Sequence, residues 1–75
     1  MGAGRDTRYG LVYSEKLHDG EPLFIFRAAD EWAITGMMRY AALVDSQDVI
    51  NRVKVEMQRF QQWQIDHPEL VKEPD

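Results

Sequence analysis

The chain has 75 residues, 44% of them hydrophobic, with no cysteine and a formal net charge of −4. This length permits one small domain, and the lack of cysteine excludes disulfide bonds and thiolate metal sites. Nine basic residues against thirteen acidic ones argue against nonspecific binding to duplex DNA, which needs a basic surface. Because a domain this small without such links often relies on a partner chain, we expect a homodimer.

The N-terminal third contains a predicted β-hairpin. Residues 1–8 are rich in glycine and polar groups, and we interpret them as a flexible arm. Residues 9–17 alternate between apolar and polar side chains, which is typical of a half-buried strand. The Asp19-Gly20 pair is a strong hairpin signal, and the apolar and aromatic run that follows it resembles a second strand. We therefore predict a hairpin formed by residues 9–17 and 22–27.

Two helices are predicted after the hairpin. The first pattern fits either one helix over residues 31–44 or a turn followed by a helix from Gly36, because glycine weakens a helix. The second pattern is long and strictly periodic from residue 47 to residue 65. Ser46 is the expected N-cap of this second helix, and Pro68 ends it because the residue before proline avoids the helical region.

These elements predict a small single α+β domain over residues 9–66, a β-hairpin followed by two α-helices. We expect dimerisation to complete the domain through the face of Leu23 and Ile25 or through the free edge of the hairpin. Residues 67–75 are expected to form an extended tail. The aromatic face of the hairpin and the stripe of the long helix predict the core, which consists of Tyr13, Phe24, Phe26, Val53, Met57 and Phe60.

Few side chains are suited to catalysis or to metal binding. His18 and His67 are far apart in the sequence, and no paired-histidine, nucleophile-elbow or phosphate-loop motif is present. We therefore predict a protein without enzymatic activity, metal or cofactor. No apolar run approaches the length of a membrane span, and no signal peptide pattern is present. We expect a cytoplasmic protein that does not bind membranes.

Arginine and aromatic residues gather between the arm and the first helix. Arginine captures phosphate or carboxylate with two parallel hydrogen bonds, and aromatic rings stack on bases. The same residue types dominate protein-binding hot spots. In the alternative reading, Trp32 covers the core and Arg27 pairs with Asp30 or Glu31. The predicted ligand- or partner-binding residues are Arg8, Arg27, Trp32, Arg39 and Tyr40.

Several segments carry a resemblance to a group of known proteins. They are Gly20–Asp30, which includes the apolar run, Met38–Leu43, Trp63-Gln64, and the closing Pro68–Asp75. In these segments the chain resembles small uncharacterised proteins of bacteriophages and prophages. That resemblance implies a bacterial cytoplasmic setting and an accessory role, and it supplies no catalytic residues.

Two functions remain open from the sequence. The first is a non-enzymatic accessory protein of phage type that binds a host protein, for example to block a bacterial defence system. The second is a protein that sequesters a small anionic ligand such as a nucleotide signal, with arginine and aromatic side chains at a dimer interface.

Overall fold

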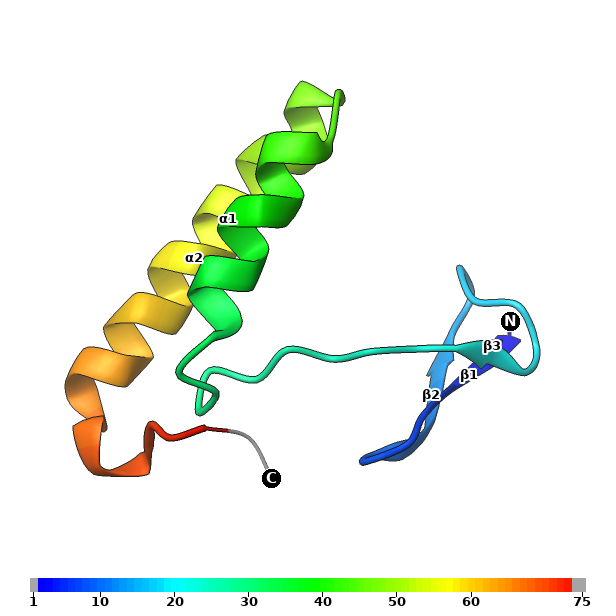
Figure 1. The fold of residues 1–75 in the computed structure, drawn as a ribbon. Coiled ribbons are helices and arrows are strands. Elements are labelled where there is room, and N and C mark those ends of the chain that lie inside the picture. The colour runs from blue at the N-terminus through cyan, green and yellow to red at the C-terminus, as the bar shows by residue number, and fades with distance from the viewer. Residues whose placement is uncertain (1, 74–75) are drawn as a thin grey trace.

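The computed structural model describes residues 2–73 and shows a small sheet followed by a helical hairpin (Figure 1). The strands are β1 (Gly2–Asp6), β2 (Gly10–Ser14) and β3 (Glu21–Pro22). The helices are α1 (Ala33–Leu43) and α2 (Gln47–Asp66), and a 3-10 helix, η1, follows at Pro68–Leu70. The predicted α+β class, with a β-hairpin followed by two helices, is confirmed.

β1 is the central strand of the sheet, whose order is β2-β1-β3. It pairs antiparallel with β2, from Gly2 opposite Ser14 to Asp6 opposite Gly10, and parallel with β3. Residues 7–9 form the turn of this hairpin, and Gly10 follows with a φ of 78°, a conformation that favours glycine. The hairpin therefore lies earlier in the chain than the sequence predicted.

The predicted flexible arm over residues 1–8 is wrong for residues 2–6, and so is the predicted pairing of residues 9–17 with 22–27. The glycines that suggested an arm instead allow close packing. A Cβ on Gly4 would lie 2.6 Å from the side chain of Leu23, and one on Gly2 would overlap the carbonyl of Leu17. The Asp19-Gly20 turn does form, but the N–H of Gly20 donates to the carbonyl of Ala3 (2.8 Å). The turn thus leads the chain across β1 instead of back onto β2.

Residues 23–29 form a linker from the sheet to the helices, irregular over 23–27 and with a turn at 28–29 (Figure 1). Of the predicted second strand only Pro22 is a strand residue, within β3. The linker therefore leaves its aromatic side chains open to solvent: Phe24 is 72% exposed. Tyr13 of β2 is 67% exposed, so neither of these residues belongs to a core. Leu23, expected at a dimer contact, is half-buried against Gly4.

The two open readings of the first helix are resolved by the structure. A turn at residues 31–32 precedes α1, which begins at Ala33, and Gly36 lies inside the helix. A Cβ on Gly36 would lie 2.8 Å from the ring of Phe26, so the missing side chain makes room for this ring. The predicted long helix is confirmed as α2, and the Oγ of Ser46 accepts a hydrogen bond from the N–H of Val49 (3.4 Å) as its N-cap.

The C-terminal segment is not simply extended, because η1 interrupts it. Beyond η1, the N–H of Lys72 donates to Ala29 (3.0 Å), and the N–H of Glu31 donates to Lys72 (3.0 Å). The side chain of Gln64 on α2 donates to the carbonyl of Ala28 (3.0 Å). These bonds fix the corner where the linker enters α1. Residues 74–75 of the predicted tail lie outside the described residues.

Little apolar surface is enclosed by this arrangement. Among residues 2–73, Ala33 is the one hydrophobic residue that is fully buried, and Val53, Met57 and Phe60 are only half-buried. Within the same range, no strand approaches a helix closely enough for their Cα atoms to lie within 8 Å. The radius of gyration is 13.7 Å, whereas a compact chain of this length is expected to have about 11 Å. The fold is therefore open.

Candidate functional site

The candidate site is organised by Asp6 at the end of β1. This carboxylate is only 2% exposed. Its Oδ1 accepts hydrogen bonds from the N–H groups of Arg8 (2.7 Å) and Tyr9 (3.2 Å), and its Oδ2 accepts one from the N–H of Ile25 (3.0 Å). One side chain thereby ties the hairpin turn to the linker. This role of Asp6 was not predicted from the sequence, although an aspartate that accepts from the backbone N–H two residues later is a common turn signal.

The pKa of Asp6 reflects two opposed effects. Burial of the carboxylate by itself raises the pKa, but the hydrogen bonds from the backbone of Arg8, Ile25 and Tyr9, together with the charge of Arg8, lower it. The lowering effects are larger in sum, so the pKa lies below its ordinary value of 3.8. Asp6 is therefore ionised at neutral pH and serves as an acceptor.

Four side chains meet around this turn and form what we call the Arg8 cluster: Arg8, Tyr9, Phe24 and Arg27. The guanidinium of Arg8 donates to the carbonyl of Ile25 (2.8 Å) and lies 5.1 Å from the ring centres of both Tyr9 and Phe24. The guanidinium of Arg27 lies 5.5 Å from the ring centre of Tyr9. These distances are typical of cation–π contacts. Two predicted site residues, Arg8 and Arg27, thus contact the same ring.

The Arg8 cluster is open to solvent and is not neutralised by ion pairs. Of the two rings in the cluster, Tyr9 is 39% exposed and Phe24 is 72% exposed. In the described residues, the one ion pair is Glu56–Arg59 on α2, so no described carboxylate lies within 4.0 Å of the guanidinium of Arg8 or Arg27. Arg27 therefore does not pair with Asp30 or Glu31, which removes the alternative reading of that residue.

The remaining predicted residues belong to α1. Trp32 is its N-cap residue, and Arg39 and Tyr40 follow two turns later on the same side of the helix, which we call the second surface. All three are exposed, with Trp32 at 58%, so Trp32 does not cover a core. No hydrogen bond, ion pair or cation–π contact joins them to the Arg8 cluster in the part of the chain that the structure describes. Phe26 lies between the two surfaces, because its ring packs on Gly36 and contacts Phe24 edge-on at 5.4 Å. The structure thus divides the predicted site in two.

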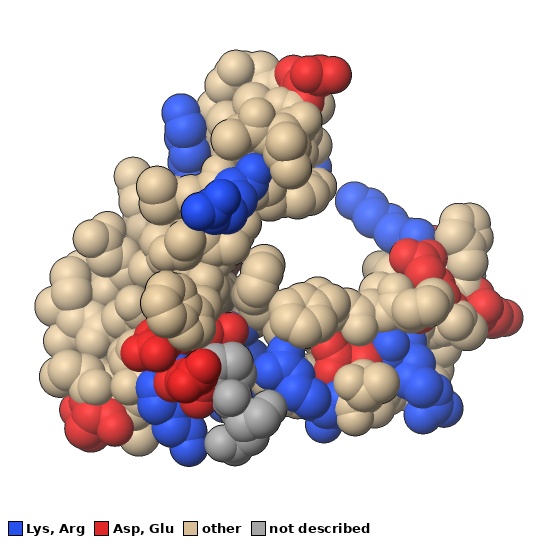
Figure 2. Space-filling view, viewed as in Figure 1, with Lys and Arg blue, Asp and Glu red and all other residues tan. Residues whose placement is uncertain are grey.

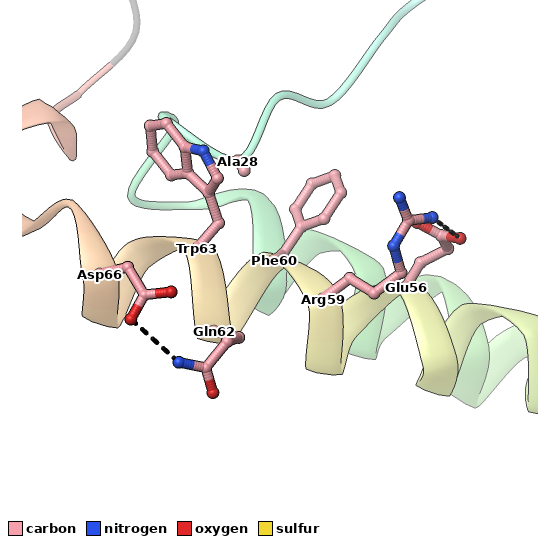
Figure 3. Close-up of a pocket in the computed structure, with 7 residues that line it drawn as sticks. All are labelled: Ala28, Glu56, Arg59, Phe60, Gln62, Trp63 and Asp66. Carbon is pink, nitrogen blue, oxygen red and sulfur yellow. Dashed lines mark hydrogen bonds and ion pairs between the residues drawn. The ribbon is translucent and has the colours of Figure 1, made fainter.

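A shallow groove runs along the C-terminal half of α2, where Phe60 and Trp63 point toward Ala28 of the linker (Figure 3). Its volume is about 460 Å³. The ring of His67 stacks on Trp63 at 4.5 Å, and its Nδ1 lies 3.0 Å from the carbonyl of Trp63. His67 is thus the C-cap residue of α2, and its ring lies against the last turn of the helix.

The described residues contain no group of three or more acidic or histidine side chains placed to hold a metal ion. Within the same residues, every buried side-chain nitrogen and oxygen atom has a hydrogen-bond partner. Neither helix of the described chain is long and apolar enough to cross a membrane.

Comparison of the chain with models of protein families, with curated proteins and with solved structures finds no match in any of the three.

Proposed function

We propose that this chain is a small non-enzymatic binding protein that acts as a homodimer and holds a host protein against the Arg8 cluster. The observation that carries the proposal is the exposed Phe24 ring beside the guanidinium of Arg8, 5.1 Å away. Arginine and aromatic side chains dominate protein-binding hot spots. Asp6 supports this use by holding the turn and the linker together.

The resemblance to small phage proteins adds the setting. It favours an accessory protein in the cytoplasm of a bacterial host, with a component of a defence system as the protein bound. The second surface at Trp32, Arg39 and Tyr40 has the same chemical character and is the competing location for the contact.

The test compares variants of the two surfaces in the same capture assay. Tagged protein is incubated with bacterial host lysate, and the retained proteins are identified after matched washes. We expect Phe24→Ala and Arg27→Ala to lose the retained protein, while Arg39→Ala and Arg52→Ala keep it. Circular dichroism must show that all four variants are folded. Loss only in Arg39→Ala would move the site to the second surface, and full retention in all four would refute both locations.

A second candidate function is capture of a small anionic ligand, and the pair of guanidinium groups against Tyr9 favours it. Both arginines lack a carboxylate within 4.0 Å in the described chain, so an anion could be held between them. Calorimetry with pyrophosphate and with cyclic nucleotides tests this. Binding that weakens markedly with salt and disappears in Arg27→Ala would support an anion site. Absence of heat with all probes would leave only the protein contact.

A further inference from the structure

α1 has the composition of a buried helix, but much of it is exposed. Of its eleven residues, only Thr35, Arg39 and Tyr40 carry a polar group in the side chain. A helix that is apolar nearly all round is normally covered on most sides. Here Met38, near the middle of α1, is 55% exposed. α2 covers one side of α1, so the side that carries Met38 requires a further layer.

An apolar groove marks where that layer belongs, and we call it the Met38 groove. All of its lining residues come from α1 and α2: Ile34, Met38, Lys54, Met57, Gln58 and Gln61. Its volume is about 330 Å³. Lys54 is the one charged side chain in the lining. Methionine and few charges are the composition of an interface core. Figure 2 shows that the helical half of the molecule is mostly uncharged in that view.

The surface area of the chain indicates how much is left uncovered. A folded monomer of 8.8 kDa is expected to expose about 4,800 Å². This chain exposes 5982 Å². The excess of about 1,200 Å² is larger than the ~800 Å² that each partner buries in a standard stable interface. The chain therefore has enough uncovered surface for a stable dimer.

We propose that a second copy of this chain docks on the Met38 groove, so that the two helical hairpins form a four-helix bundle. This inference rests on the homodimer in the proposed function and names its surface. Met38 is the central residue of α1, and Met57 lies at the middle of α2. A two-fold axis through the groove therefore places both grooves face to face along their whole length. Such an arrangement gives each helix the layer that it lacks.

The α2 lining residues are compatible with this axis. If the two α2 helices run antiparallel and cross between Met57 and Gln58, Lys54 of one copy lies opposite Gln61 of the partner subunit. Like charges are then kept apart, and Met57 lies opposite the polar but uncharged Gln58 of the partner subunit. The groove is thus self-complementary, as a two-fold interface must be.

The test combines oligomeric state with cross-linking of the full chain. In sedimentation equilibrium at micromolar concentration we expect twice the 8.8 kDa monomer mass for the wild type. Met38→Glu should sediment as a monomer, whereas the matched exchange Leu43→Glu, on the same helix outside the groove, should remain a dimer. Because the chain has no cysteine, Gln58→Cys should form an intermolecular disulfide under mild oxidation, and Val55→Cys, also on α2, should not.

Each outcome decides a separate point. A wild-type monomer would overturn both the homodimer and its surface. A dimer that persists in folded Met38→Glu, or that cross-links through Val55→Cys and not through Gln58→Cys, would overturn the surface alone. Capture of the host protein by Phe24→Ala and Arg27→Ala is measured independently, so it tests the Arg8 cluster whatever the oligomeric state.

Discussion

At the scale of single residues, Asp6 connects the hairpin turn to the linker. Its two oxygens accept three backbone N–H groups from the turn and the linker. A buried backbone N–H group without an acceptor destabilises the fold, so the closed turn requires the carboxylate of Asp6. The Arg8 cluster depends on it, because Arg8 and Tyr9 are the residues whose N–H groups Asp6 holds.

Replacement of Asp6 by Asn should lower the melting temperature at neutral pH, because the new NH₂ group cannot accept from Ile25. The pKa of Asp6 is lowered in the folded chain, so its stabilisation is complete above the ordinary pKa of 3.8 and is lost as pH falls through the lower value. The gap in melting temperature between wild type and Asp6→Asn should therefore close at acid pH. Asp45→Asn, at an exposed aspartate, is the control and should show no such gap.

Gly36 presents a conflict between helix propensity and packing. Alanine favours a helix by about 1 kcal/mol over glycine, but a Cβ here would lie 2.8 Å from the Phe26 ring. In a Phe26→Ala background, Gly36→Ala should stabilise the fold by about 1 kcal/mol. With Phe26 present, the same change should give a smaller gain or a loss. Urea unfolding of the four proteins measures this coupling; equal effects in both backgrounds would show that the ring does not pack on Gly36.

At the scale of elements, α2 is the helix whose bounds are best explained by its local sequence. It runs from Gln47 to Asp66, its N-cap is Ser46, and it ends before Pro68. Each of these features is local to the helix. The corner between linker and helices depends instead on distant contacts, because Gln64 of α2 donates to the carbonyls of Ala28 (3.0 Å) and Asp30 (3.3 Å).

The cap of α2 gives a prediction with a conservative control. Ser46→Ala removes the acceptor for the N–H of Val49 and should lower the free energy of unfolding by about 1 kcal/mol. Ser46→Asp keeps an acceptor and adds a negative charge at the positive end of the helix, so it should be as stable as wild type. Denaturant unfolding followed by circular dichroism measures both. Equal losses in the two variants would contradict a capping role.

At the scale of the whole molecule, the sheet and the helical hairpin are joined mainly by the linker and do not enclose a common core. Figure 2 shows the open space between them. A chain that buries so little apolar surface by itself is expected to be marginally stable. Its stability should then depend on association through the Met38 groove.

That dependence predicts a melting temperature that rises with protein concentration. When folding and association are coupled, mass action stabilises the folded dimer as the chain becomes more concentrated. Calorimetric scans over a hundredfold range of concentration should show the rise for wild type and Leu43→Glu. Met38→Glu should melt at a lower temperature that does not change with concentration. A wild-type melting temperature independent of concentration would argue against a dimer.

The sequence by itself determined the elements whose causes are local. The period of the apolar residues predicts α2, Ser46 predicts its N-cap, and Pro68 predicts where it ends. The order of the predicted elements indicates the α+β class. The exposed position of Trp32 agrees with its prediction as a binding residue.

Only the tertiary structure decided how the strands pair and where the predicted site residues lie. Strand pairing is non-local, so the hairpin of β1 and β2 competes with the one expected around Asp19-Gly20, and local turn signals cannot rank them. The outcome depends on Gly2 and Gly4, whose missing side chains admit the chain beyond β2, and on Asp6, which accepts from Ile25 across the fold. Once β1 occupies the centre of the sheet, the linker is left unpaired, and Arg27 is placed near Arg8 while Arg39 is left on α1.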